Sequence, residues 1–218
     1  MTPNFAAAVD PIFLHVLSLL ERISHSESPN PNEERTVINN WLRNAEAQLG
    51  QKQDWELAKY ALVAWIDDVL IEAPWQGRLW WKENALEVEA FNSRDRATLF
   101  YAKALEAAKM TRRDALEVFY VCVVLGFRGL YRDSAATFLA DQMGLPANLD
   151  AWASLTAKSI QLGQGRPPIT ESPRPGEGAP PLQGRYTLVG TALLGVALAA
   201  VAAVLGLVLF TMGNGETP

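Results

Sequence analysis

The sequence predicts an all-α protein, in which a bundle of about seven or eight helices is followed by a single C-terminal transmembrane helix. Along most of the chain, apolar residues recur at spacings of three and four, which places them on one face of a helix. No segment shows a convincing alternation of apolar and polar residues between hairpin turns, which is the pattern of a β-strand. The run at residues 186–212 contains no charged side chain and is longer than the roughly 20 residues that cross a bilayer.

Two apolar stripes begin the predicted bundle. The first lies within residues 5–20 and is formed by Phe5, Val9, Ile12, Phe13, Val16, Leu17 and Leu20. Asn30 then supplies a helix cap and Pro31 a first-turn proline, and the helix that follows is expected to end at Gly50. Its stripe consists of Val37, Ile38, Trp41, Leu42, Ala45 and Leu49.

The third predicted helix, which opens at Asp54 and ends before Pro74, is the centre of the bundle. Residues 60–71 are apolar on nearly every face, so we expect this helix to be surrounded by others. Its only charged side chains there are Asp67 and Asp68, which a rotation of about 100° per residue directs to different sides. They are therefore not expected to act as a pair, and each should bind arginine, backbone amides or water. The basic candidates are Arg78, Arg128 and Arg132.

The remaining helices of the bundle are expected to be shorter. Thr111 and Asp114, three residues apart, give a weak capping signal for a helix that ends near Gly126. The predicted segments are residues 80–90, 94–109, 111–126, 134–143 and 149–162.

The composition fits one folded domain at residues 1–162. The chain has 218 residues, of which 49% are hydrophobic and 20% are charged, and its net charge is −5. This acidic balance argues against nucleic-acid binding, which requires a clustered basic surface. Cys122 is the only cysteine and lies in an apolar run, so we expect a core thiol in a reducing compartment. Neither histidine, His15 or His25, follows a glutamate by three residues, which disfavours a metal centre in the bundle.

The C-terminal part of the chain is expected to attach the domain to a membrane. A linker rich in proline and glycine at residues 163–185 precedes the tail anchor at 186–212, and a short periplasmic tail follows at 213–218. Arginines precede the span and none follows it, which predicts a single-pass protein with a cytoplasmic N-terminal domain. One face of the span carries small residues that would allow another membrane helix to pack closely: Ala192, Gly195, Ala199, Ala202 and Gly206.

Motifs of common enzyme classes are missing from the sequence. It has no glycine-rich loop ending in Gly-Lys-Ser or Gly-Lys-Thr and no Gly-x-Ser-x-Gly element. We therefore expect a non-enzymatic protein without cofactor or bound metal. The alternative from a different functional class is a tail-anchored enzyme that uses Asp67 or Asp68 as acid or base. That alternative predicts a concave pocket around a carboxylate with a strongly raised pKa.

Four motifs are specific enough to indicate a family. They are ALVAWIDDVLI at residues 61–71, PWQGRLWW at 74–81, LEVEAF at 86–91 and DALEVFYVCVVLGFRGLYR at 114–132. Together with the late apolar span, they resemble the TssL/DotU family of type VI secretion systems, which has relatives in type IVB systems. The family usually has Asp-Glu where this chain has Asp67 and Asp68, and often has an acidic Gly-Glu element where residues 92–96 are basic here.

The resemblance implies a non-enzymatic scaffold subunit in the bacterial inner membrane. Such a subunit would assemble the membrane complex of a type VI secretion system and dock its cytosolic baseplate. The partners that it implies are a TssM-like inner-membrane protein, a TssJ-like lipoprotein and baseplate components, and homodimerisation is a further option. A DotU-like component of a type IVB system is the alternative within the same class.

Candidate docking residues come from three parts of the bundle. Gly126 and Gly129 permit a tight turn that would present nearby basic and aromatic side chains together. Two interpretations remain open: these side chains and the tryptophans complete the core, or they form an exposed docking surface. The two aspartates are also candidate docking residues, because they are the only charged side chains in an apolar stretch of helix. The full set is Asp67, Asp68, Trp75, Trp80, Trp81, Arg128, Tyr131 and Arg132.

Overall fold

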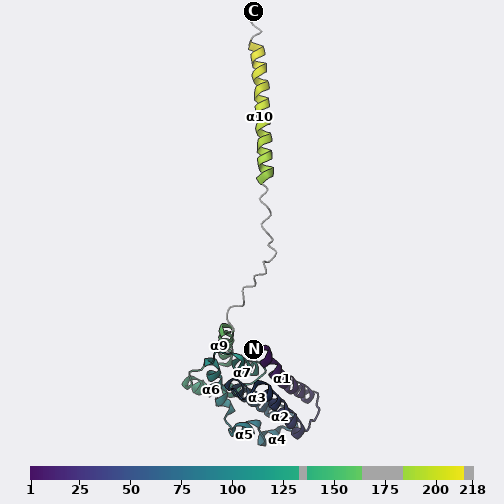
Figure 1. Ribbon diagram of the computed structural model, residues 1–218, viewed down its shortest axis with the longest axis vertical. Coiled ribbons are helices and arrows are strands. Elements are labelled where there is room, and N and C mark those ends of the chain that lie inside the picture. Colours follow the sequence, from purple (N-terminus) through teal and green to yellow (C-terminus); the bar gives the residue numbers. More distant parts are fainter. Residues whose placement is uncertain (133–136, 164–183, 214–218) are drawn as a thin grey trace, which may run out of the picture. The chain divides into compact units, whose positions relative to one another are not determined.

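The computed structural model of the chain describes residues 1–132, 137–163 and 184–213 (Figure 1). Two compact units are present, Met1–Pro167 and Pro168–Pro218. Every regular element in the described ranges is helical, which confirms the all-α prediction.

The helices of the first unit follow one another with short connections. The α-helices are α1 (Pro3–Ser24), α2 (Pro31–Leu49), α3 (Gln53–Glu72), α4 (Arg78–Glu83), α5 (Leu86–Phe91), α6 (Arg96–Lys109), α7 (Asp114–Val124), α8 (Thr137–Gln142) and α9 (Leu149–Gly163). A short 3-10 helix, η1 (Gly129–Arg132), follows α7. Asn30 caps α2 as predicted, since its side-chain oxygen accepts a hydrogen bond of 3.0 Å from the backbone N–H of Asn32.

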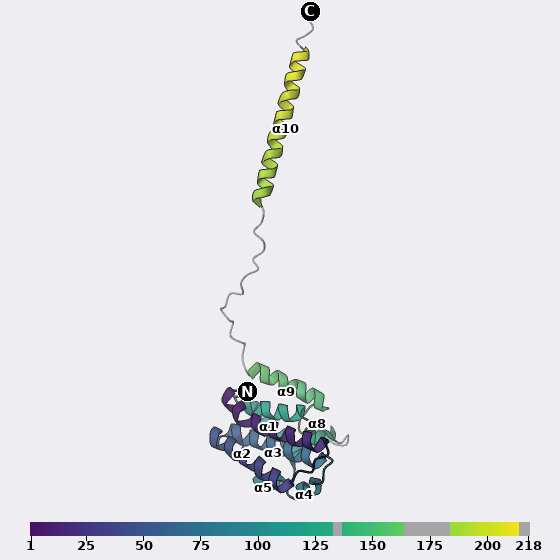
Figure 2. The ribbon, with the colours of Figure 1, turned by 90° about the vertical axis from the view of Figure 1, so that its right-hand side faces the viewer.

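Helix α3 forms the centre of the first unit, with α1, α2, α4, α5, α6 and α7 arranged around it (Figures 1 and 2). From Trp55 to Ile71 nearly all of its side chains are buried, including both aspartates. A helix with apolar residues on every side is stable in water only when other helices cover it. The expectation of a central third helix is therefore confirmed.

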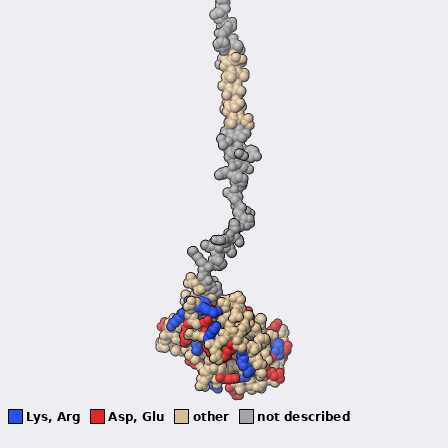
Figure 3. Space-filling view, in the orientation of Figure 1, with Lys and Arg blue, Asp and Glu red and all other residues tan. Residues whose placement is uncertain are grey.

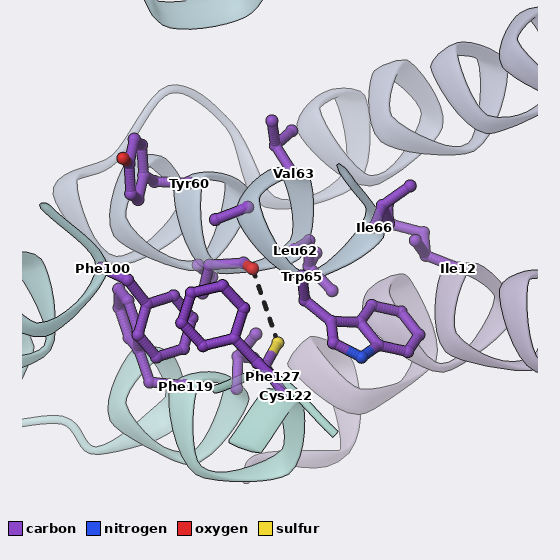
Figure 4. Close-up of a cluster of buried hydrophobic side chains, with 14 of the residues drawn as sticks. Ile12, Tyr60, Leu62, Val63, Trp65, Ile66, Phe100, Phe119, Cys122 and Phe127 are labelled. Atoms are coloured by element: carbon purple, nitrogen blue, oxygen red, sulfur yellow. Dashed lines mark hydrogen bonds between the residues drawn. The ribbon is translucent and has the colours of Figure 1, made fainter. Parts of the chain in front are cut away.

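The core around α3 is rich in aromatic side chains (Figure 4). The rings of Phe100 and Phe127 stack with centroids 3.9 Å apart, and Phe119 meets Phe100 edge-on at 4.8 Å. Beside them the thiol of Cys122 donates a hydrogen bond of 3.6 Å to the carbonyl of Ala61. Burial raises the pKa of this thiol well above its usual value. Cys122 is thus a core thiol, as the sequence predicted.

The first residues of the chain secure the start of α7. The backbone N–H of Thr2 donates to Asp114 at 2.6 Å, and the N-terminal amine of Met1 pairs with Glu117. The capping signal that the sequence suggested at Thr111 is absent, because no side chain caps this helix locally. The acidic first turn of α7 is instead satisfied by Met1 and Thr2, more than a hundred positions away in sequence, and by Arg112, whose guanidinium lies 2.7 Å from Asp114.

The apolar stripes of α1 and α2 do not all face the core. Leu17 is 37% exposed, and Val37 and Trp41 are 37% and 36% exposed. On α1 the core positions near the C-terminal end are taken by Leu19 and Ile23 instead. Both helices are therefore apolar over a wider arc than their buried side requires.

The second unit contains helix α10, Gly184–Gly213. The side chains described in it, from Ala192 to Leu207, form a short apolar helix. Among the described residues, α1 is the helix that is both long and apolar enough to cross a membrane, but it is a core helix of the first unit. A helical conformation of residues 186–212 is thus present, and its role as a membrane span stays a prediction. Most of the predicted linker and tail lies outside the described residues.

Candidate functional site

A groove of about 420 Å³ lies where α1, α3 and α7 end, and we call it the terminal groove. Apolar side chains of α1 and α3 line one part of it, among them Leu20, Ile23 and Val69. Charged side chains line the other part, namely Asp68, Glu72, Arg128 and Arg132. The groove therefore combines an apolar surface with charges of both signs.

The turn after α7 positions the arginines of the groove. Gly126 adopts a φ of 107°, while the N–H of Phe127 bonds to the carbonyl of Cys122 and the N–H of Gly126 to that of Val123. These bonds form a Schellman motif, which needs a left-handed residue at its second-last position. Gly129 also has a positive φ, of 48°, and a Cβ there would lie 2.7 Å from the ring of Phe127.

Arg132 holds two carboxylates of α3 together. Its guanidinium nitrogens lie 2.7 Å from Asp68 and 2.9 Å from Glu72, one helical turn further on. A second arginine, Arg96, places its Nε 3.8 Å from Asp68. Burial raises the pKa of Asp68, and the two arginines oppose this rise. Asp68 is thus an ion-paired carboxylate at the edge of a groove.

Asp67 points to the opposite side of α3 and is completely buried. Its carboxylate accepts hydrogen bonds from Trp81 Nε1 at 2.9 Å, from Leu86 N at 2.9 Å and from Glu87 N at 2.8 Å. Burial raises its pKa to about 6, although these three donors favour the charged form. The divergence of the two aspartates agrees with the helical geometry expected from the sequence.

The bonds of Asp67 also explain a break in the helical pattern. The sequence predicted one helix over residues 80–90, and this is wrong: α4 ends at Glu83 and α5 starts at Leu86. The first two N–H groups of α5 cannot bond within their own helix, and the carboxylate from α3 accepts both. A cap supplied from another helix leaves no local signal in the sequence.

The three tryptophans form one cluster rather than a row of exposed rings. Trp81 is fully buried between Trp75 and Trp80, with ring centroids 6.3 Å and 6.1 Å away. Trp75 Nε1 donates to the carbonyl of Leu70 at 2.8 Å, and the Arg35 guanidinium lies 5.9 Å from the centre of the Trp80 ring. Trp75 and Trp80 remain partly exposed, so only their outer edges could reach a partner.

The structure thus divides the residues proposed from sequence into two groups. Asp68, Arg128 and Arg132 meet in the terminal groove, with the Arg128 side chain exposed. The hydroxyl of Tyr131 donates to the carbonyl of Pro146 at 2.6 Å, which fixes the loop behind η1. Asp67 and Trp81 lie together in the core. Sequence reasoning missed Glu72 and the α1 side of the groove, although the spacing of four from Asp68 to Glu72 could have indicated the former.

The charges in the visible surface are mixed. In Figure 3, lysine and arginine side chains are interspersed with aspartate and glutamate over the face of the first unit that is shown. In the part of the chain whose side chains are described, no group of three or more His, Cys, Asp or Glu side chains could hold a metal ion. The side chains that line the terminal groove offer ion pairing and apolar contact.

The sequence profile of the family described as type VI secretion system protein DotU matches residues 4–213. The chain belongs to the DotU family. The cytoplasmic domain of TssL from Acinetobacter baumannii has a similar structure, with a TM-score of 0.59 and 22% sequence identity. That likeness covers 74% of this chain and 99% of the other, and it shows a shared fold. No curated protein matched the chain.

Membership of the DotU family confirms the resemblance read from the four sequence motifs. It identifies a type VI secretion component of a family associated with membranes. Family and fold are those of a structural component of the secretion system and not of an enzyme family.

Proposed function

We propose that the protein is a non-enzymatic scaffold subunit in the inner membrane, which assembles the type VI membrane complex and docks the cytosolic baseplate. Residues 186–212 would anchor it with the helical domain in the cytoplasm and residues 213–218 in the periplasm. Its partners would be a TssM-like membrane protein, a TssJ-like lipoprotein reached through the complex, and baseplate components. The family match supports this role, and the arginine bias before the span supports the orientation.

The terminal groove is the observation that carries the docking part of this proposal. Its apolar side is open, and the two positive charges of Arg132 and Arg96 balance Asp68 and Glu72, so a partner need not supply a charge there. Arg128 on the rim is exposed and forms no ion pair among the described residues. A partner segment with one carboxylate for Arg128 and apolar side chains for Leu20 and Ile23 would fit this surface.

The geometry of the two aspartates weighs against the enzyme alternative. An acid or base must lie within hydrogen-bond reach of its substrate. Asp67 is fully buried and its oxygens are occupied by three protein donors. Asp68 is held by Arg132 and faced by Arg96, which keeps it as a structural ion-pair partner. Asp67 therefore has a raised pKa without access to a substrate, and Asp68 lines the terminal groove with its carboxylate already bound to arginine.

Purification of the full-length protein from native membranes would test the docking role. Replacing Arg128 by alanine should reduce recovery of baseplate components by roughly fivefold or more, because losing an ion pair that docking would bury costs over about 1 kcal/mol. Recovery of the large inner-membrane partner should stay the same. The control is Lys82→Ala, which removes an exposed cation from α4. Equal recovery of every partner by both variants would show that the terminal groove is not the docking site.

A further inference from the structure

A second surface of the first unit carries apolar side chains that lie outside the core. Leu14 is 67% exposed on α1, and Leu17 beside it is 37% exposed. Val37 and Trp41 on α2 are exposed to 37% and 36%. We call these four residues the outer stripe.

The relative position of α1 and α2 is fixed by side-chain hydrogen bonds. The two helices lie side by side and antiparallel (Figures 1 and 2). His15 Nε2 lies 3.0 Å from a carboxylate oxygen of Glu34, and Gln48 Nε2 lies 3.2 Å from the side-chain oxygen of Asn4. In this register Val37 is about level with Leu14, because each residue of a helix advances about 1.5 Å.

The outer stripe is therefore continuous across both helices. Trp41 lies one turn beyond Val37, and Leu17 lies about one turn beyond Leu14 in the other direction. At about 100° per residue, Leu14, Val37 and Trp41 turn away from the side that α1 and α2 pack on α3, and Leu17 borders them. Together they make a diagonal band over the helix pair.

Acidic side chains border this band. Asp10 and Glu21 are exposed on the same side of α1 as Leu14, at spacings of four and seven from it. Glu33 is exposed on α2, one turn before Val37. Within the described part of the chain, none of these three carboxylates forms an ion pair.

The basic residues of the helix pair do not balance these acids. Arg22 pairs with Glu27 and Glu34, and Arg35 pairs with Glu89. Arg43 lies on the other side of α2, where it lines a cavity against α3 and α5. The outer stripe is thus an apolar band with an excess of negative charge at its edges.

We infer that the outer stripe of α1 and α2 binds an amphipathic helix of a partner protein whose polar side is basic. Apolar side chains at spacings of three and four on that helix would cover Leu14, Leu17, Val37 and Trp41. Lysine or arginine beside them would face Asp10, Glu21 and Glu33. Such a helix would cross the α1–α2 pair along the diagonal of the band. This surface is separate from the terminal groove, so the inference does not depend on the docking role proposed above.

Binding of a designed peptide to the full-length protein tests this inference. The protein would be placed in nanodiscs of phosphatidylcholine, and empty nanodiscs would correct for binding to lipid. The probe is a fluorescent helical peptide with leucine on one side and lysine on the other, and its counterpart carries glutamate in place of lysine. We expect saturable binding of the lysine peptide, about tenfold tighter than that of the glutamate peptide, because the three exposed carboxylates attract lysine and repel glutamate. Higher salt should reduce this difference.

Variants of exposed residues identify the surface. The double substitution Leu14→Ser and Val37→Ser should weaken binding of the lysine peptide about tenfold, since it removes the middle of the apolar contact. The triple substitution Asp10→Asn, Glu21→Gln and Glu33→Gln should remove the preference for lysine over glutamate. Leu79→Ser is the control, because Leu79 on α4 is 73% exposed on another part of the unit. Equal loss with this control would overturn the inference.

Footprinting without peptide shows whether lipid or a second copy of the chain already covers the outer stripe. Hydroxyl-radical labelling of Leu14 should be strong in the free protein and should fall when the lysine peptide is added. Protection of Leu14 before any peptide is present would mean that lipid or a second copy covers the stripe, and would overturn the inference. Equal binding of the lysine and glutamate peptides would overturn it as well.

Discussion

Asp67 and Asp68 are adjacent in sequence but have different structural roles. Asp68 lies at the terminal groove and is neutralised by Arg132. Asp67 lies on the other side of α3 and holds the start of α5 and the ring of Trp81. A helix turns by about 100° per residue, so neighbouring carboxylates can serve two unrelated parts of a bundle. Of the two, Asp68 is the one that lies at the surface proposed for docking.

Asp67 should give the protein a pH-dependent stability. Its pKa is about 6 when folded and 3.8 in the reference state, so between these values the folded state binds more protons. Its contribution to the free energy of unfolding therefore falls as pH rises from about 4 to 6, by on the order of 3 kcal/mol. The amide introduced by Asp67→Asn cannot titrate, so the stability advantage of the native protein over this variant should shrink over the same range.

Denaturation of both proteins at a series of pH values, followed by circular dichroism, measures this difference. Near pH 4, Asp67→Asn should cost about 1–3 kcal/mol, because the amide NH₂ places a second donor against the N–H of Glu87, and this cost should shrink as the pH rises to 6. The exposed Asp10→Asn controls for the loss of one carboxylate from an acidic chain. If the stability of the native protein relative to Asp67→Asn grows between pH 4 and 6, the three hydrogen bonds to Asp67 lower its pKa by more than burial raises it.

At the scale of single elements, backbone strain is found at the end of helix α1. Helix α1 ends in a Schellman motif, since Glu27 N bonds to the carbonyl of Arg22 and Ser26 N to that of Ile23. The left-handed residue is Ser26, with a φ of 65°, where α7 has Gly126. Glycine at position 26 would relieve this backbone strain, but it would also increase the entropy of the unfolded chain. The first effect is the larger, so Ser26→Gly should stabilise the protein by about 0.5–1 kcal/mol.

Thermal unfolding would show the effect of Ser26→Gly as a higher midpoint. Ser28→Gly in the same loop is the matched control, because Ser28 has no positive φ and glycine there only loosens the unfolded chain. Its midpoint should stay the same or fall. If both variants behave alike, the left-handed turn at the end of α1 carries no strain.

Local patterns in the sequence were sufficient for most elements but not for those fixed over long distances. The periodic segments gave α1, α2, α3, α6, α7 and α9, and Asn30 gave a helix cap. The break between α4 and α5 was missed because its cap comes from Asp67 on α3. The groove could be anticipated only in part, since Arg132 was named but its second carboxylate, Glu72, was not. Leu17, Val37 and Trp41 were placed in the same apolar stripes as the buried residues, because periodicity cannot separate a buried face from an exposed apolar one.

At the scale of the whole molecule, the two units differ in structure and in expected location. The first unit has the fold of a TssL cytoplasmic domain, which a bundle of this size can form without metal or disulfide. The second unit contains the helix expected to enter the membrane. The family match extends to residue 213 and thus includes that helix. The proposed scaffold function requires the first unit to lie on the cytoplasmic side of the membrane.

Cysteine labelling would establish the topology of the full chain. Cys122 is the only natural cysteine and is buried, so it contributes little background. We expect Thr217→Cys to react with a maleimide that cannot cross the inner membrane, because the arginine bias predicts a periplasmic C-terminal tail. Ser172→Cys, before the span, should react only after the inner membrane is permeabilised. The reverse pattern would place the helical domain in the periplasm, where it could not reach a cytosolic baseplate.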